Sequence, residues 1–394
     1  MGNNARYFVW ANGLQNLGDQ VVAAKTVLPA LFQSAGVPNF FTGLLVPIRE
    51  SGSMLPQAAL SPWVSTHRAR KRLWIIGSVG QAASAAALGI GALLFDVWLL
   101  GLFSLLALAF LSLFRALCSL AGKDVQGRTI PEKQRGQVTG RATALGGAAT
   151  LLVGILLAFL GELPQWALAV VILAGASTWA FAALVFGGVE EPVSEEEPRG
   201  IDKRWWTDTW TLFTGNKHFR DFVIVRSLLL VSALSTSFIV LLHPVGLAGF
   251  VLASGLAALL GGRVSGMLSD ASSSRTMALG AGLASVLLLG LVAADYWAPE
   301  AVLVWVMPLG FFLVHLAHTA VRVARKTYIV NMAEGDERTR YVGAANTLMG
   351  VMLLGMGGVS AVISMAGPDV ALLFLALVGF VGVWRARRLP EAIG

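Results

Sequence analysis

The chain has 394 residues, of which 56% are hydrophobic and 13% are charged, and its formal net charge is +7. Soluble domains carry roughly 25% charged residues, so this composition and a mean hydropathy of +0.71 exclude an ordinary soluble protein. The basic balance does not indicate nucleic-acid binding, because Lys and Arg gather beside apolar runs as in membrane proteins. A single cysteine, Cys118, excludes an internal disulfide framework.

Twelve apolar segments are long enough to cross a lipid bilayer, which takes about 20 mostly apolar residues. The predicted spans are residues 7–31, 38–62, 73–94, 97–120, 139–161, 165–187, 221–242, 245–267, 275–296, 300–324, 341–366 and 369–386. The predicted fold class is therefore an all-α membrane protein with twelve transmembrane helices.

The connections between these spans alternate in charge. Those on one side are short and carry no Lys or Arg, but hold acidic residues such as Asp96, Asp295 and Asp369. Basic residues gather in the connections on the other side. Because positively charged connections stay in the cytoplasm, we expect a multi-pass protein of the plasma (bacterial inner) membrane with both termini cytoplasmic.

A basic motif occurs twice, at Arg135–Gly140 and at Arg338–Gly343, and the offset between the copies is 203 residues, about half the chain. Such a repeat is typical of carriers that are built from two similar bundles. We predict three parts: a six-helix bundle in 1–187, a cytoplasmic linker in 188–220 and a second six-helix bundle in 221–394.

The predicted linker contains a short amphipathic pattern. Trp206, Trp210 and Phe213 are spaced i, i+4, i+7, which predicts a helix that lies at the membrane surface. An anchor for the linker is the simpler interpretation, and a lipid-sensing element is the functional alternative.

Two bundles of six spans, a long central linker and cytoplasmic termini together resemble the major facilitator superfamily. The family signature follows the second span of each half, and in the second half it fits at Gly266, Asp270 and Arg275. In the first half Pro62 and Thr66 stand where the family has Gly and Asp, while Arg70 and Lys71 remain. The resemblance implies that these loop residues form a cytoplasmic gate. Drug exporters of the family carry a Gly-Pro pair in the fifth span, and residues 139–161 contain no proline.

The first predicted span carries a polar stripe. At about 100° per residue, one face holds Asn12, Gln15, Asn16, Asp19 and Gln20. A stripe of this kind must face water, substrate or another helix, because polar groups in lipid are costly. Asp19 is a candidate proton site, and a structural ion pair is the alternative. On the same wheel Lys25 falls on the opposite face.

The second predicted span carries Arg49 and Glu50 side by side. Neighbours on a helix point about 100° apart, so each needs a partner of its own. Both a gate ion pair and a contact with substrate are open interpretations. Glu50 is the second candidate for proton coupling.

The resemblance implies that the first, fourth, seventh and tenth spans line a central cavity. The last three of these spans offer Arg115, Arg226 and His315. With so few acids inside the spans, we expect at least one cation, Arg115 or Arg226, to be unpaired in the empty carrier. A membrane histidine is either a packing group or a proton relay.

The function predicted is secondary active transport of a small anionic or zwitterionic organic solute by proton-coupled alternating access. The predicted substrate-binding residues are Asn12, Asn16, Gln20, Arg49, Arg115, Arg226 and His315. A multidrug exporter of the same superfamily is the alternative, followed by a non-transporting membrane sensor. No phosphate-binding loop, metal-ligand spacing or catalytic set is visible, so we expect no cofactor, no enzymatic activity and no nucleic-acid partner. The expected partners of a monomeric carrier are its substrate, protons or another coupling ion, and the bilayer.

Overall fold

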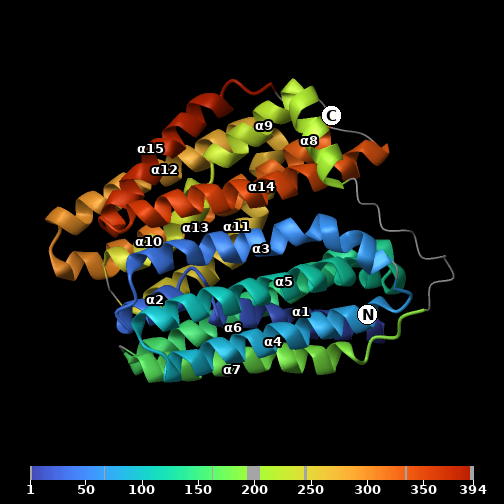
Figure 1. The fold of residues 1–394 in the computed structure, drawn as a ribbon, viewed down its shortest axis with the longest axis horizontal. Helices are drawn as coiled ribbons and strands as arrows, with labels where there is room; N and C mark the ends of the chain where they lie inside the picture. The colour runs from blue at the N-terminus through green and yellow to red at the C-terminus, as the bar shows by residue number, and fades with distance from the viewer. Residues whose placement is uncertain are drawn as a thin grey trace.

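The computed structural model describes residues 2–65, 67–161, 163–192, 205–243, 246–332 and 335–390, and these form helices and short connections. Side chains are described within these ranges except at 58, 61–62, 65, 132–133, 135–137, 205, 262–271, 326, 330–331 and 335–340. Figure 1 shows the helices in two groups, one formed by α1–α7 and the other by α8–α15. The fold class is the one predicted, an all-α membrane protein of two bundles.

The helices of the first group are α1 (Asn3–Val21), α2 (Val27–Ser34), α3 (Asn39–Ser65), α4 (Arg70–Leu94), α5 (Val97–Thr129), α6 (Glu132–Leu160) and α7 (Gln165–Phe186). Those of the second group are α8 (Trp205–Gly215), α9 (Lys217–Leu228), α10 (Val231–Leu242), α11 (Leu247–Ala271), α12 (Ser273–Trp297), α13 (Glu300–Met332), α14 (Gly335–Ile363) and α15 (Pro368–Ala386). Among the described residues, nine of the twelve predicted spans meet a length and hydropathy criterion for membrane crossing. The described parts of the first, second and eighth predicted spans do not meet it.

The first predicted span is not one helix. It is interrupted at residues 22–26, between α1 and α2. Pro29 explains where the helix is interrupted. Proline has no N–H, and its ring clashes with the carbonyl four residues earlier, which here belongs to Lys25. The helical wheel that placed Lys25 opposite the polar stripe assumed a continuous helix, and that assumption was wrong.

The corresponding span of the second half is also interrupted, at Leu229 and Leu230 between α9 and α10. This stretch contains neither proline nor glycine. Its residues pack instead against glycines of α15, where Gly382 faces Leu229 and Gly379 faces Val231. Both bundles therefore begin with a span that is broken within its apolar part.

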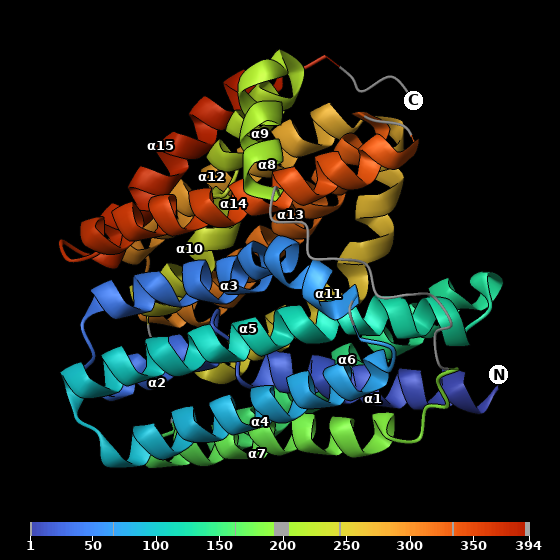
Figure 2. The same ribbon diagram turned by 45° about the vertical axis from the view of Figure 1, so that its right-hand side comes forward.

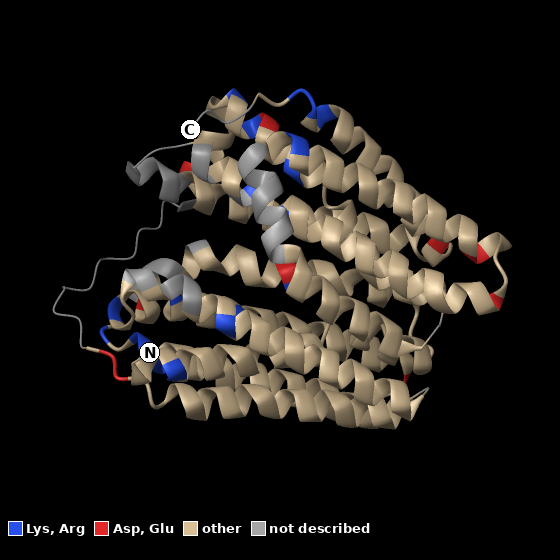
Figure 3. Cartoon of the chain, turned by 180° about the vertical axis from the view of Figure 1, so that it is seen from behind, with Lys and Arg blue, Asp and Glu red and all other residues tan. Residues whose placement is uncertain are grey.

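Several helices run further than the predicted spans. α5 continues to Thr129 and α13 to Met332, so the basic connection expected after residue 120 is helical. Figure 3 shows Lys and Arg concentrated at the end of the molecule that holds both termini, which we call the basic end. The opposite end, which we call the short-loop end, includes the short connections at 35–38, 95–96 and 298–299.

The two bundles contact each other mainly through two helix pairs, α3 with α14 and α6 with α11. The Ser51 hydroxyl donates a hydrogen bond of 2.8 Å to the carbonyl of Gly350. Gly357 packs against the Pro47 ring and Gly147 against Leu259. Small residues let helix backbones approach closely in membranes. Beyond these contacts the two groups spread apart toward the basic end (Figure 2).

α8 is the helix predicted within the linker range. Thr209 and Leu212 are buried, and α8 packs against α9 and α14. Trp206 and Trp210 are exposed on its other side. The helix itself is confirmed, and its location at a membrane surface stays a prediction. α9 begins at Lys217, inside the range that was predicted as linker.

Candidate functional site

A cavity of about 450 Å³ lies between the bundles. Its walls come from α1, the interruption after α1, α3, α5 and α6 of the first bundle, and from α11 and α13 of the second. Six charged side chains line it: Asp19, Lys25, Arg49, Glu50, Arg115 and Arg322. Three residues of the polar stripe, Asn16, Asp19 and Gln20, therefore face this cavity and not lipid, where exposing them would be costly.

Asp19 binds two arginines from two other helices. Its Oδ1 lies 2.7 Å from Nη2 of Arg49 on α3, and its Oδ2 lies 2.5 Å from Nη1 of Arg115 on α5. The Asp19 side chain is 16% exposed. Both carboxylate oxygens are occupied, so Asp19 ties three helices of the first bundle together. Of the two arginines named as candidates for an unpaired cation, Arg115 is therefore paired with a carboxylate.

Lys25 and Glu50 form the second ion pair of the cavity. Lys25 Nζ lies 3.5 Å from Glu50 Oε1, and the Glu50 side chain is 33% exposed. Arg322 and Arg325 of the second bundle also act electrostatically on Glu50. Glu50 thus has one direct partner at 3.5 Å, and Arg49 beside it and two basic residues of the second bundle also act on it.

The charges around the cavity do not balance. Four cationic side chains face two carboxylates, which leaves an excess of two positive charges among the described lining residues. Charges at membrane depth are costly unless they meet an opposite charge or water. The cavity therefore provides a favourable electrostatic environment for an anion.

His315 lines the same cavity from α13. Its Nδ1 atom is buried and has no hydrogen-bond partner among the described residues. Its neighbour His318 is instead buried against the Ser232 hydroxyl, with Nδ1 at 3.2 Å. His315 is therefore the histidine of this pair that faces the cavity.

Arg226 does not line this cavity, although the sequence placed it there. It is 5% exposed, and its Nη2 donates a 3.2 Å hydrogen bond to Asn346 Oδ1. Its Nε has no partner among the described residues, and the charged group that acts on it is another cation, Arg325. Arg226 therefore belongs to the interior of the second bundle.

The remaining polar stripe residues contact the second bundle or a smaller cavity. Gln20 lines the main cavity and accepts a 3.1 Å hydrogen bond from the Ser254 hydroxyl of α11. Asn16 lines both cavities, and its amide donates to the carbonyl of Ala142. Asn12 lines only the smaller cavity, which lies within the first bundle.

The predicted gate residues of the first half interact within their own bundle. Arg70 pairs with Asp124 of α5, and Lys71 Nζ donates to the carbonyl of Val189. The Glu191 carboxylate accepts the backbone N–H groups of both gate residues, at 3.2 and 2.8 Å, and so caps the first turn of α4. In the second half Gly266 and Asp270 lie in the part of α11 whose side chains are outside the described residues, and Arg275 is exposed.

Lys25 and Arg322 are the charged residues of the cavity that sequence reasoning did not include among the site residues. Lys25 was missed because its helix was taken as continuous, although Pro29 marks the interruption. Arg322 lies toward the end of the predicted span 300–324 and was not assigned to the cavity. Because α13 continues to Met332, Arg322 lies well before the end of the helix, and it lines the cavity.

The ion pair between Asp19 and Arg49 should be measurable in a double-mutant cycle. Asp19→Asn leaves two guanidinium groups without a counter-charge, so we expect a loss of about 3 kcal/mol of unfolding free energy. Adding Arg49→Met should cost less than the sum of the single changes, with a coupling of about 1–3 kcal/mol. Unfolding of the purified protein in micelles gives these values. Arg275→Met, at an exposed arginine of the other bundle, is the control and should be additive. Additivity of Asp19→Asn with Arg49→Met would contradict the assignment.

Comparisons with known proteins agree with this architecture. The family model described as the Major Facilitator Superfamily matches residues 20–352. A POT family transporter in complex with 5-aminolevulinic acid is similar in structure, with a TM-score of 0.75 at 14% identity over 96% of this chain and 94% of that one. The nucleoside transporter NupG gives a TM-score of 0.74 at 14% identity, covering 98% and 99%. The xylose transporter XylE from E. coli, in an inward open conformation, gives 0.73 at 13% identity, covering 99% and 97%. At these identities the structures share the fold alone.

No curated protein matches the sequence. The family model nevertheless covers more than half of the chain, and the structural similarity extends over nearly all of it. The chain therefore belongs to the major facilitator superfamily of membrane transporters.

Proposed function

We propose that this transporter moves a small organic anion or zwitterion by proton-coupled alternating access. The observation that carries the proposal is the excess of two positive charges around a cavity of about 450 Å³ at the bundle interface. Arginine suits this role, because its planar guanidinium binds carboxylate or phosphate through two hydrogen bonds. Arg115 contacts Asp19 through Nη1 and has a side chain that is 28% exposed. A substrate carboxylate can therefore reach Arg115 from the cavity.

The lining of the cavity disfavours the drug-exporter alternative. Apart from His315, no aromatic side chain is among the described residues that line it. Pockets for amphipathic compounds are predominantly apolar and aromatic, with few polar groups. A non-transporting sensor would have little use for a charged cavity of this size. The tests below give different results for these alternatives and for transport of an anion or zwitterion.

Binding should depend on the geometry of Arg115. We expect purified protein to be stabilised against heating by carboxylates or phosphates, since a ligand at 100 times its Kd adds about 2.7 kcal/mol. Arg115→Lys should weaken this binding by more than tenfold, because an ammonium group cannot form the bidentate contact. Arg387→Lys, at an exposed site outside the predicted gate, is the matched control. Stabilisation by lipophilic cations that is insensitive to Arg115→Lys would favour the drug exporter instead.

Of the two candidate coupling residues, Glu50 is the more exposed to the cavity. Asp19 has both oxygens bound to arginines, whereas Glu50 has one partner at 3.5 Å and is about twice as exposed. A proton on Glu50 would release Lys25 to meet an anionic substrate. Asp19 would then act mainly by holding Arg49 and Arg115 in position.

This division of roles predicts different defects for two conservative changes. Glu50→Gln should retain substrate exchange but lose accumulation driven by a pH gradient, because the variant cannot carry a proton at this site. Asp19→Asn should also weaken binding, because its arginines lose their anchor. Counterflow and gradient-driven uptake into proteoliposomes separate the two cases. Full gradient-driven uptake by Glu50→Gln would exclude Glu50 as the coupling group.

We propose that the basic end faces the cytoplasm of a plasma or bacterial inner membrane, since Lys and Arg are retained there. Cysteines at Asp96 and Asp369, in a Cys118→Ser background, should react with an impermeant maleimide in intact cells. A cysteine at Arg275, which is exposed at the basic end, should react only after permeabilisation. The reverse labelling pattern would invert the topology.

A further inference from the structure

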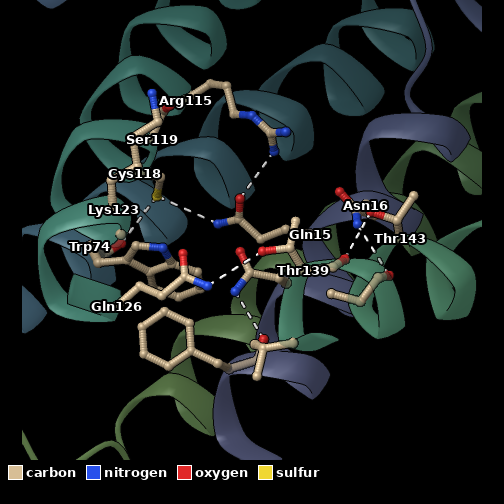
Figure 4. A pocket seen from close by; sticks show the side chains of 15 residues that line it. Gln15, Asn16, Trp74, Arg115, Cys118, Ser119, Lys123, Gln126, Thr139 and Thr143 are labelled. Atoms are coloured by element: carbon tan, nitrogen blue, oxygen red, sulfur yellow. Dashed lines mark hydrogen bonds between the residues drawn. The ribbon is translucent and has the colours of Figure 1, made fainter. Parts of the chain in front are cut away.

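A second cavity, of about 380 Å³, lies inside the first bundle. It is enclosed by α1, α4, α5 and α6, and its side chains are drawn in Figure 4. It shares four lining residues with the main cavity: Asn16, Arg115, Ser119 and Thr143. The two cavities therefore meet at a common boundary, and Arg115 is the cation of that boundary.

The smaller cavity has a different chemistry from the main one. No carboxylate is among the described residues that line it, and its two charged groups are Arg115 and Lys123. Neutral amide and hydroxyl side chains make up much of the rest: Asn12, Gln15, Asn16, Ser119, Gln126 and Thr139. Amides and hydroxyls both donate and accept hydrogen bonds, as the hydroxyl groups of a ligand do. Trp74 and Phe8 supply an apolar side.

The boundary between the cavities is held rigidly. The Gln15 side chain is buried, and its amide nitrogen contacts Ser78 Oγ at 3.3 Å and Cys118 Sγ at 3.4 Å. Its Oε1 accepts a 3.1 Å hydrogen bond from Arg115 Nη1, the atom that also pairs with Asp19. Trp74 is likewise fixed, because it stacks on Phe186 with ring centroids 3.8 Å apart. The Arg115 guanidinium therefore has a defined position between an anion-binding space and a neutral polar one.

We propose that the smaller cavity binds the hydroxylated part of a substrate whose carboxylate lies at Arg115 in the main cavity. The ligand class is a polyhydroxylated carboxylate, that is, a sugar acid. This inference rests on the proposed function, because it takes anion binding as given and assigns the rest of the molecule. A site that hydrogen-bonds substrate hydroxyls discriminates strongly against analogues that lack them, since its polar groups are then left unpaired.

Two probe anions of equal charge and chain length test whether the smaller cavity binds hydroxyl groups. Gluconate carries hydroxyl groups along a six-carbon carboxylate, and hexanoate has the same chain without them. Calorimetric titration of the full-length protein in nanodiscs should give a Kd for gluconate, or for its relatives glucuronate and galactonate, at least tenfold lower than for hexanoate. Equal affinity for hexanoate and all three sugar acids would show that the smaller cavity does not bind hydroxyl groups, but would leave the proposal of anion binding intact. Binding of no anion at all would overturn both proposals.

Two variants that replace an amide by a leucine test whether the smaller cavity is the source of the preference for sugar acids over hexanoate. Asn12→Leu and Gln126→Leu each remove polar atoms from residues that line only the smaller cavity. Either variant should reduce the ratio of the hexanoate Kd to the sugar-acid Kd to less than threefold, while the Kd for hexanoate stays as in the wild type. Asn3→Leu, at an exposed position of the same helix as Asn12, is the matched control and should keep the preference. If both cavity variants keep it too, the hydroxyl groups bind elsewhere and the assignment is wrong.

Discussion

Asp19 holds two arginines from different helices in a part of the protein where a lone charge is costly. Removing Asp19 leaves both arginines without this counter-charge, whereas removing one arginine leaves the other still paired, so the set depends on the carboxylate. The same bridge fixes the Arg115 guanidinium between the two cavities, in contact with Gln15. The position of the candidate site thus depends on a single carboxylate that no substrate has to touch.

The contacts between the two bundles differ in kind from the contacts that hold the charged side chains of the cavity. The ion pairs described around the cavity lie within the first bundle, whereas the described hydrogen bonds between bundles use neutral groups such as Ser51 with Gly350 and Ser254 with Gln20. Separating neutral groups costs less than separating buried charges. One bundle can therefore move against the other without breaking the contacts that shape the binding surface, which suits alternating access.

Much of this could be predicted from the sequence, and the failures have physical causes. Composition, charge alternation and helical periodicity predicted the membrane fold and the polar stripe around Asp19. The interruption that contains Lys25 was readable from Pro29. The matching interruption at Leu229 has no local signal and follows from packing against α15 glycines. The partners of Arg49 and Arg226 depend on helix rotation and depth, which a single sequence does not determine.

The length of α5 and α13 has a consequence for how a solute arrives. Each helix has 33 residues, so at about 1.5 Å per residue it is roughly 50 Å long, against about 30 Å of hydrocarbon. Both therefore extend beyond the hydrocarbon at the basic end, where Lys and Arg are concentrated (Figure 3). There α5 carries Lys123, whereas its Arg128 is paired with Asp124. An anionic substrate, as proposed, would meet this positive end before it reaches the bilayer. Because ions screen such a field over about 8 Å at physiological ionic strength, its rate of capture from that side would fall as salt concentration rises.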